Sequence, residues 1–392
     1  MKLSPFLLKN FKFTLLLLAG LILGLGLTSC EKKKGASSNE ANTPASEPII
    51  IGVAGAHSGD LAPYGLPPKH TVAIAAAELN KAGGVLGRQI KIIAQDDVCK
   101  PGIATDVASK LISQGVIAVI GHICSGATNA ALSVYRGAKI PVISPSATSP
   151  ELTLEGQNPY FFRTIPHDAA QAIVQADFIV KHLKAKRVVV VHDKGDYGKG
   201  LATLVKKELE SKGVEILLFE GVTPGAVDYS ALIRKIAQAN PDVVAFGGYH
   251  PEGSKIVTQA RKRDIKAAFI SGDGLKDPSF IKIGGKFVEG YYVTSPADIS
   301  TLAMTIKVNE QLKAKGQEAG NFGLQAHAAF TALIKAIETS KSTKPEDIKT
   351  ALMQNKVATT LGEISFDKNG DVVGSGFSVY QVEDSKFKQL AW

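Results

Sequence analysis

Short apolar runs of strand length alternate along most of the chain with longer segments that have the spacing of helices. In the first third, each run is rich in Val and Ile and ends in a turn of small polar residues, which is typical of strands buried on both faces of a parallel sheet. The predicted strands there are Pro48–Ala56, Ile90–Gln95, Val116–Ile120 and Ile140–Ile143. The predicted helices are Thr71–Lys81, Ile103–Gln114 and Ala127–Tyr135. This alternation predicts a doubly wound α/β sheet.

The alternation pauses at an extended segment, Pro159–Ile165, which we interpret as a crossover, and then begins again. The second set of predicted strands is Arg187–His192, Val214–Phe219, Val243–Phe246, Ala267–Ile270 and Gly290–Thr294. The second set of predicted helices is Ala169–Leu183, Gly200–Ser211, Tyr229–Ala239 and Gly253–Lys262. The pattern therefore predicts a second lobe of the same class.

Three further helices follow a second crossover near residues 295–297, which is more than the second lobe needs. They are predicted over Thr301–Lys315, Phe322–Ser340 and Pro345–Gln354, with short strands at Glu363–Phe366 and Phe377–Gln381. We expect the chain to return to the first lobe and to cross a third time near residues 374–376. The prediction is two α/β lobes joined by a multi-strand hinge, residues 49–164 with 297–375 and residues 165–296 with 376–392. Such lobes form a cleft that can close on a small ligand.

Small hydroxyl-bearing residues follow two strands in the middle of the first lobe. The turn after Val116–Ile120 is Gly121–Gly126, and the turn after Ile140–Ile143 is Ser144–Thr148. The carboxyl ends of parallel strands are where ligands bind in open α/β sheets, and the free N–H groups of a helix start suit an anion. Ser and Thr also cap helices that bind nothing, so each turn alone is a weak signal. Two such turns on neighbouring strands favour a binding site.

The N-terminus has the pattern of an export signal. Lysines precede the apolar stretch Phe13–Leu27, which ends at Leu27-Thr28-Ser29-Cys30. This tetrad resembles the lipobox of bacterial lipoproteins, so we expect a signal peptide over residues 1–29 and a lipid on Cys30. Residues 30–48 form a polar tether with too few apolar residues to fold. The alternative is a single membrane-spanning helix, which the glycines in the stretch disfavour. The expected location is outside the cytoplasm, in the periplasm or at the cell surface, anchored by lipid to a bacterial membrane.

Composition changes this picture little. Hydrophobic residues make up 45% of the chain and charged residues 21%, as in a folded protein with sizeable cores. The net charge of +9, less the three lysines of the signal peptide, leaves +6. No basic segment with interleaved aromatics remains, so we expect no nucleic-acid partner.

The remaining cysteines and the catalytic motifs narrow the function. Cys99 and Cys124 each follow a predicted strand, and an exported chain favours a disulfide between them if the two strands are neighbours. Two buried free thiols are the alternative, and no Cys-x-x-Cys or His-x-x-x-His spacing suggests a metal. Gly-x-Gly-x-x-Gly, the phosphate loop, Gly-x-Ser-x-Gly and His-Glu-x-x-His spacings do not occur either. We therefore expect neither an enzyme nor a cofactor.

Six turn sequences together resemble the leucine/isoleucine/valine-binding protein family. They are Gly55-Ala56-His57-Ser58-Gly59, Asp96-Asp97-Val98-Cys99, Gly121-His122-Ile123-Cys124-Ser125, Pro145-Ser146-Ala147-Thr148, His192-Asp193-Lys194 with Tyr197-Gly198, and Gly247-Gly248-Tyr249-His250-Pro251-Glu252. The family comprises the solute receptors of branched-chain amino acid ABC importers, with the type I periplasmic-binding-protein (Venus-flytrap) fold. The resemblance extends from about Ile49 to Tyr380 and rests on the order and spacing of the motifs.

The resemblance implies an amino acid site between the lobes. Ser125 and Thr148 would bind the α-carboxylate, and the Ser146 carbonyl and the Thr148 hydroxyl would accept from the ammonium, with Ala147 between them in the turn. Asp273 would complete the ammonium site from the second lobe, since a buried zwitterion needs charge-assisted partners at both ends. Tyr64, Tyr197, Tyr249 and Phe322 would line the rest of the pocket. A Cys99–Cys124 disulfide is also a feature of the family and would stiffen the loop that holds Ser125.

Departures from the family pattern concern the choice of ligand. Asp273 stands where Glu is usual, His57 where an apolar residue is usual, Ser146 where Ala is usual, and Leu324 where an aromatic is common. Leu, Ile or Val is the expected ligand, and another amino acid, a short aliphatic amide or urea is the alternative, as is a sensor role. Each tyrosine, and Asp273 itself, could instead only pack or form a turn. The expected partners are the permease subunits of an ABC importer, and the expected state is a monomer.

Overall fold

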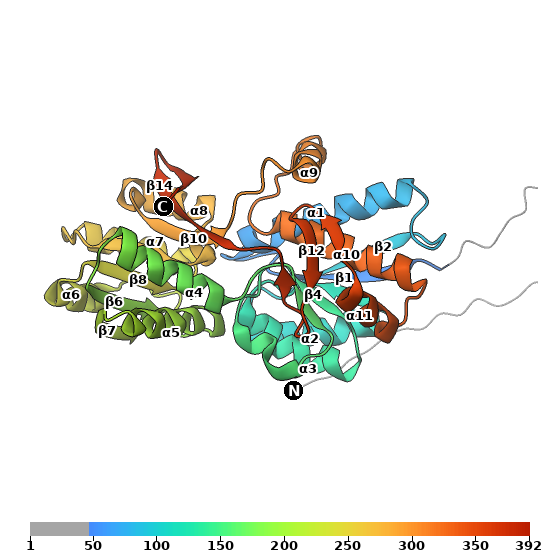
Figure 1. Ribbon diagram of the computed structural model, residues 1–392, viewed down its shortest axis with the longest axis horizontal. Helices are drawn as coiled ribbons and strands as arrows, with labels where there is room; N and C mark the ends of the chain where they lie inside the picture. Colours follow the sequence, from blue (N-terminus) through green and yellow to red (C-terminus); the bar gives the residue numbers. More distant parts are fainter. Residues whose placement is uncertain (1–46) are drawn as a thin grey trace, which may run out of the picture. The chain divides into compact units, whose positions relative to one another are not determined.

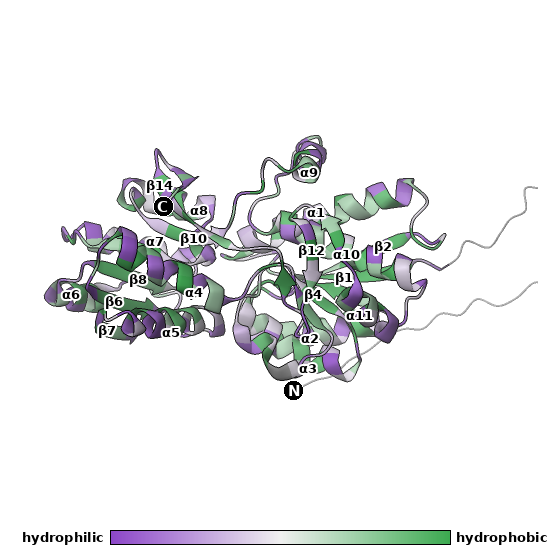
Figure 2. Ribbon diagram, in the orientation of Figure 1, coloured by the Kyte–Doolittle hydropathy of each residue, from purple (hydrophilic) through white to green (hydrophobic). Residues whose placement is uncertain are grey.

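Five parallel strands form a sheet in the order β2-β1-β3-β4-β5 in the computed structural model, which describes residues 47–392 (Figure 1). The strands are β1 Ile49–Gly55, β2 Ile90–Asp96, β3 Ala118–Ile120, β4 Val142–Ser144 and β5 Phe161–Arg163. They are short and mostly apolar (Figure 2). The side chains of β1, β3, β4 and β5 are largely buried, whereas those of the edge strand β2 are mostly only half-buried. The segment predicted as a crossover thus contributes the edge strand β5, which pairs with β4 before the chain leaves the sheet.

Helices from two distant parts of the chain cover this sheet. They are α1 Ala62–Lys81, α2 Pro101–Ser113, α3 Ser125–Gly137, α10 Gly323–Ser340 and α11 Pro345–Gln354. One apolar core joins β1 to α1, α10 and α11, and another joins β1 and β3 to α2 and α3. The late helices therefore return to the first sheet. We call this assembly the first lobe; it also carries α9 Ala303–Lys313 and a small sheet of β11 Val357–Thr359, β12 Gly362–Phe366 and β13 Val372–Val373.

Seven strands form the sheet of the second lobe, in the order β15-β14-β10-β9-β8-β6-β7. The parallel strands are β6 Arg187–His192, β7 Glu215–Gly221, β8 Val243–Gly247, β9 Ala268–Ser271 and β10 Tyr292–Pro296. The antiparallel strands are β14 Phe377–Glu383 and β15 Lys386–Gln389. The helices are α4 Asp168–Asp177, α5 Asp196–Ser211, α6 Ser230–Ala239, α7 His250–Arg261 and α8 Pro278–Gly284. Apolar cores lie on both sides of the sheet, as in a doubly wound fold.

The chain passes between the two sheets three times: from β5 to α4, from β10 to α9, and from β13 to β14. The predicted fold class, two doubly wound lobes joined by several connections, is confirmed.

Several elements differ from the prediction: α8, β5, β11 and β13 were not predicted, and α4 ends at Asp177 rather than near Leu183. The start of α1 and the strand β15 also differ. Helix α1 begins at Ala62, nine residues before Thr71, and continues through Pro67 and Pro68. Gly65 explains part of this: a Cβ there would lie 2.0 Å from the Ala56 carbonyl oxygen, so the first turns pack directly on the end of β1. Strand β15 was not predicted because its exposed residues are mostly polar, as is common at a sheet edge.

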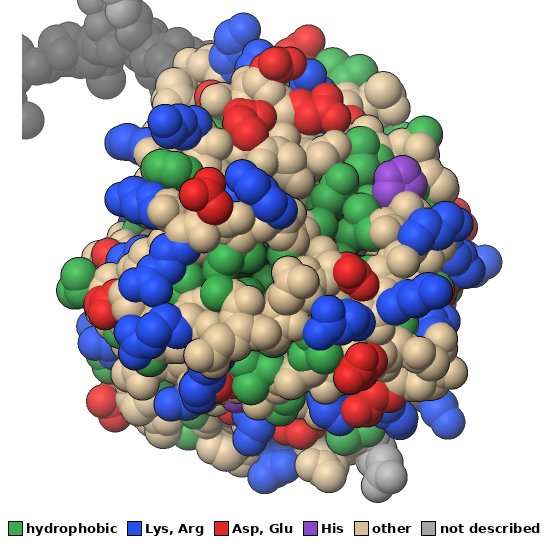
Figure 3. All heavy atoms as spheres, turned by 90° about the vertical axis from the view of Figure 1, so that its left-hand side faces the viewer, with side chains coloured by type: hydrophobic (Ala, Val, Ile, Leu, Met, Phe, Trp, Pro, Cys, Tyr) green, Lys and Arg blue, Asp and Glu red, His purple; other side chains and the backbone are tan. Residues whose placement is uncertain are grey.

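The predicted signal peptide, Cys30 and residues 30–46 of the tether lie outside the described residues. Within residues 47–392, the helices are all too short or too polar to cross a bilayer. Figure 3 shows one face of the molecule, on which Lys and Arg side chains are dispersed among Asp and Glu.

Candidate functional site

The two hydroxyl-rich turns lie side by side, because β3 and β4 are paired neighbours. Hydrogen bonds hold them together: the Ser144 hydroxyl donates to the His122 carbonyl at 2.6 Å, and the Ser146 hydroxyl donates to the Ile123 carbonyl at 2.8 Å. The Ser149 N–H donates to Ser125 Oγ at 3.2 Å. The side chains of both turns are thereby fixed before any ligand arrives.

Ser125 is the first residue of α3 and is buried. The first N–H groups of a helix have no partner within it, and they carry the positive end of the helix dipole. No residue of this first turn is itself acidic, although the Asp196 carboxyl of the second lobe lies near Gly126 and accepts from Asn129 Nδ2 at 3.2 Å. The start of α3 therefore offers donors to an anionic group such as a carboxylate.

Asp273 approaches from the second lobe, in a short turn after β9, and is 3% exposed. Its Oδ1 accepts from the Tyr197 hydroxyl at 2.9 Å and from Gln171 Nε2 at 3.0 Å. Burial raises the pKa of Asp273 to about 6, although these two hydrogen bonds favour the carboxylate form. No cationic side chain hydrogen-bonds this carboxyl within residues 47–392, so it can receive a cation from a ligand.

Aromatic side chains connect the two lobes around the same point. The Tyr64 hydroxyl, from α1, donates to the Gly274 carbonyl at 2.6 Å and lies 2.5 Å from His250 Nδ1. Its ring is 5.8 Å from that of Tyr249 and 6.2 Å from that of Phe322. The lobes are therefore in direct contact at the aromatic wall of the site.

A cavity lies between these groups. It is lined by Tyr64, Ile123, Ser125, Ser146 and Phe322 from the first lobe and by Tyr197, Tyr249, Asp273 and Gly274 from the second. About 260 Å³ of the space between them is free of protein atoms, a figure that includes open solvent. Only about 10 Å³ of it could hold the centre of a water molecule, so the lobes must separate to admit an amino acid.

Seven of the nine predicted ligand residues line this cavity, and two do not. Ala147 packs in the core between β1, β3, α2 and α3, and its carbonyl accepts from Arg163. Thr148 is completely buried, and its carbonyl accepts from the Asp168 N–H at 2.8 Å. Thr148 thus lies behind the cavity wall rather than on it.

Several buried oxygen atoms behind the wall have no hydrogen-bond partner within residues 47–392. They are Thr148 Oγ1, Gln171 Oε1 and both carboxylate oxygens of Asp168. Buried polar groups are normally paired, because leaving one unpaired is costly. All of these oxygen atoms can accept hydrogen bonds, and Gln171 also donates to Asp273 through its Nε2. The region is therefore suited to a ligand that brings N–H donors and positive charge.

Asp168 and Gln171 were not predicted as site residues. The sequence shows only their spacing: Asp168, Gln171 and Gln175 lie three and four residues apart, on one face of α4. The structure adds that all three are buried. A stripe of polar residues on a buried helix face is unusual and indicates a functional role.

The disulfide between Cys99 and Cys124 is present, with Cα atoms 5.4 Å apart. The two strands that precede these residues are not neighbours, because β1 lies between β2 and β3, and the loops beyond the strand ends meet instead. A second link joins the same loops: His122 Nδ1 lies 2.5 Å from Asp97 Oδ2, and its Nε2 lies 3.1 Å from the Tyr135 hydroxyl. The loop that carries Ser125 is therefore tied twice to the end of β2.

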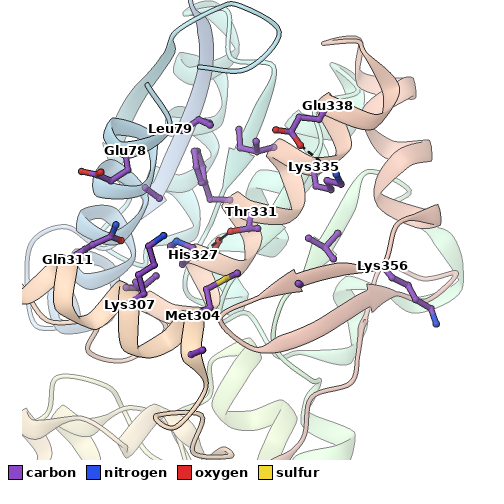
Figure 4. A pocket seen from close by; sticks show the side chains of 17 residues that line it. Glu78, Leu79, Met304, Lys307, Gln311, His327, Thr331, Lys335, Glu338 and Lys356 are labelled. Carbon is purple, nitrogen blue, oxygen red and sulfur yellow. Dashed lines mark hydrogen bonds and ion pairs between the residues drawn. The ribbon is translucent and has the colours of Figure 1, made fainter. Parts of the chain in front are cut away.

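A larger cavity, of about 720 Å³, lies within the first lobe between α1, α9 and α10 (Figure 4). Its walls are mostly apolar, and Lys335 and Glu338 at its edge form an ion pair at 3.8 Å. Among the side chains described for this cavity, no buried polar atom lacks a partner. The smaller cavity between the lobes, with its unpaired oxygens, is the better candidate for a specific polar ligand.

Comparison with known proteins agrees with this geometry. Residues 48–387 match the family model described as "Periplasmic binding protein". The leucine-, isoleucine-, valine-, threonine- and alanine-binding protein of Pseudomonas aeruginosa is 37% identical over 338 residues, which cover 86% of this chain and 90% of that protein. The Leu/Ile/Val-binding protein of Escherichia coli K12 is 35% identical over 341 residues, 87% of this chain and 92% of that protein.

Two solved structures are similar throughout. The leucine-binding protein LivK of Thermotoga maritima has a TM-score of 0.81 and 27% identity, covering 88% of this chain and 98% of its own. The branched-chain amino acid transporter substrate-binding protein LivJ of Streptococcus pneumoniae, in complex with isoleucine, has a TM-score of 0.78 and 27% identity, covering 88% of this chain and all of its own. The chain belongs to the periplasmic binding protein family, whose members are solute-binding proteins and not enzymes.

Proposed function

We propose that this protein is an extracytoplasmic receptor that binds leucine, isoleucine or valine between its lobes and delivers it to an ABC importer. The observation that carries this proposal is the opposition of two charges across one cavity. Buried Asp273 on the second lobe faces the donor-rich start of α3, with Ser125, on the first lobe. An α-amino acid carries both of the complementary charges, whereas a neutral amide or urea lacks one or both.

The residue roles follow from the same arrangement. Ser125 and the N–H groups around it bind the α-carboxylate, and Asp273 with the Ser146 carbonyl binds the ammonium. Thr148 contributes its hydroxyl oxygen, which has no hydrogen-bond partner among residues 47–392 and so remains available to the ammonium. Tyr64, Tyr197, Tyr249 and Phe322 surround the side chain, and their apolar area favours an aliphatic group.

A second candidate is a small or hydroxylated amino acid. It is supported by the Pseudomonas relative, whose name includes threonine and alanine. A thermal-shift screen against the common amino acids and short aliphatic amides separates these possibilities, because a ligand that binds only the folded state raises the melting temperature. Leucine, isoleucine and valine should give the largest shifts. If these three give none while an amide or another amino acid does, the proposed specificity is wrong.

We further propose that the mature protein is a monomer, exported to the periplasm or cell surface and held to a bacterial membrane by lipid on Cys30. Its partners are then the permease subunits of the importer. The Lys32–Glu47 tether would leave the lobes free to open at the membrane surface. A Cys30→Ser variant should fractionate away from membranes and lose incorporation of labelled fatty acid, and a wild type that takes up no label would refute the anchor.

A further inference from the structure

Asp168 is a buried acid to which the proposed binding mode gives no role. It is the first residue of α4 and is completely buried, yet neither carboxyl oxygen has a hydrogen-bond partner within residues 47–392. Its backbone N–H donates to the Thr148 carbonyl at 2.8 Å, which ties the start of α4 to the second hydroxyl-rich turn. Its side chain therefore lies immediately behind the candidate ammonium site.

A second acid lies close by on the other side of Gln171. Gln171 is one turn further along α4 and donates to Asp273 at 3.0 Å, while its own Oε1 is unpaired. Residues three apart on a helix are neighbours on its surface. Asp168, Gln171 and Asp273 thus form a buried group with two carboxyls and several unused acceptors.

The basic groups near Asp168 are engaged elsewhere or uncharged. Arg163 forms an ion pair with Asp371 and donates to the carbonyls of Ala147 and Ser149, at 3.1 and 2.8 Å. Burial, followed by the charge of Arg163, lowers the pKa of His167, the residue before Asp168, so His167 is neutral near pH 7.

Burial therefore disfavours the charged form of Asp168, and few neighbouring groups offset this effect. It raises the pKa of Asp168 well above the ordinary value, and the charge of Asp273 raises it further. The Thr148 hydroxyl is close enough to the carboxyl to lower its pKa, although the two do not form a hydrogen bond of normal geometry, and the charge of Arg163 lowers it too; neither cancels the effect of burial. Asp168 is the first residue of α4, where the helix dipole favours a negative charge. The carboxyl is therefore placed to ionise when a cation binds beside it.

We propose that Asp168 is the second carboxyl of the ammonium site, neutral while the cavity is empty, and that it gives its proton to the solvent when the ligand's ammonium enters. The inference rests on the proposed function, because it requires a ligand that carries an ammonium. The charges balance: the ligand's ammonium group brings one positive charge, and Asp168 changes from neutral to one negative charge. Two carboxylates, Asp168 and Asp273, then share the donors of a single ammonium, with Thr148 accepting beside them.

The test is calorimetric titration with leucine near pH 7 in buffers that differ in ionisation enthalpy. The slope of observed enthalpy against buffer enthalpy gives the number of protons released per leucine, which should be positive and should approach one at pH values where Asp168 is protonated in the free protein. The affinity should then rise by about tenfold per pH unit while Asp168 is protonated in the free protein. Asp168→Asn should bind without releasing a proton, and Asp264→Asn, an exposed acid whose side chain is 88% exposed, should behave as the wild type.

An infrared difference spectrum between free and leucine-bound wild type gives a second reading if Asp168→Asn does not fold. It should show the loss of one protonated carboxyl band on binding. Tight binding by the wild type with no proton release, or unchanged release in Asp168→Asn, would overturn this inference and leave the proposed function standing. If no amino acid binds the wild type, the proposed function fails and this inference fails with it.

Discussion

Asp273 shows how one residue can serve binding at a cost to stability. Its carboxyl is 3% exposed, and its two hydrogen bonds come from the neutral donors Tyr197 and Gln171. Such a group is poorly compensated in the free protein but well placed to pair with an ammonium. Two predictions follow from this residue.

Asp273→Ala should weaken leucine binding by about 10- to 100-fold, because a charge-assisted hydrogen bond contributes about 1.5–3 kcal/mol. Binding of 4-methylpentanamide, which has no ammonium, should change little. Calorimetric titration of both compounds measures the difference, and Asp264→Ala is the matched control. Equal losses for the two ligands would refute the ammonium role of Asp273.

The same residue predicts a pH dependence of the free protein's stability. The pKa of Asp273 is raised by burial to about 6, so the unfolded chain ionises this group at lower pH than the folded protein does. Asp273 therefore makes the free energy of unfolding fall as pH rises through about 6. At pH 7, Asp273→Asn should raise the free energy of unfolding by about 1–2 kcal/mol while it weakens leucine binding. Urea unfolding at pH 5 and pH 7 tests this, and a variant less stable than wild type at pH 7 would contradict it.

At the scale of elements, the site depends on how β3 and β4 end. The loop after β3 is held to the loop after β2 by the Cys99–Cys124 disulfide and by the contact between His122 and Asp97. The first link is covalent and mainly restricts the unfolded chain. The second is buried and involves His122, a residue of the same turn that carries Ser125.

These two links should therefore separate stability from binding. Replacing Cys99 and Cys124 by Ser should cost about 3 kcal/mol of unfolding free energy, as expected for a disulfide between residues 25 apart. Leucine affinity at a temperature where the variant is folded should change by less than about fivefold, because the Asp97–His122 contact still holds the turn. Denaturant unfolding and calorimetry measure the two quantities. A large loss of affinity with intact folding would show that the disulfide itself shapes the site.

The elements also show what the sequence could and could not predict. The pattern of apolar residues identified most strands of the two sheets and most of the helices that cover them. The strands are short apolar runs, and the helices repeat an apolar face over several turns. The pattern placed the start of α1 too late, since Pro67 and Pro68 ordinarily end a helix, whereas here the packing of Gly65 on Ala56 holds the first turns in place. The surroundings of Asp168 could not be predicted, because they depend on the order of the strands within each sheet. The order of the strands along the chain does not determine that order.

At the scale of the whole molecule, side-chain hydrogen bonds join the two lobes directly. Tyr64 contacts His250 and Gly274, and Asn129 Nδ2 donates to Asp196 at 3.2 Å. These contacts stabilise a closed arrangement in which the cavity is too small for an amino acid. Binding must therefore involve opening at the hinge, and the affinity depends on the balance between open and closed forms.

Tyr64→Phe should shift that balance toward the open form, because it removes the two hydrogen bonds to the second lobe and keeps the ring. Small-angle scattering should give a larger radius of gyration for the free variant than for free wild type, and saturating leucine should bring the two together. The apparent affinity for leucine should fall by up to about tenfold. Identical scattering of the two free proteins would mean that Tyr64 does not hold the lobes together.

The central claim is that both charges of an α-amino acid are bound across the cleft. Calorimetric titration with leucine, 4-methylpentanoate and 3-methylbutylamine tests it most directly, since the three compounds share the aliphatic group and differ only in the charged groups. Leucine should bind with a Kd in the micromolar range or tighter, and each analogue should bind at least about 100-fold more weakly, because each leaves one buried partner unsatisfied. Binding of either analogue as tightly as leucine would contradict the account.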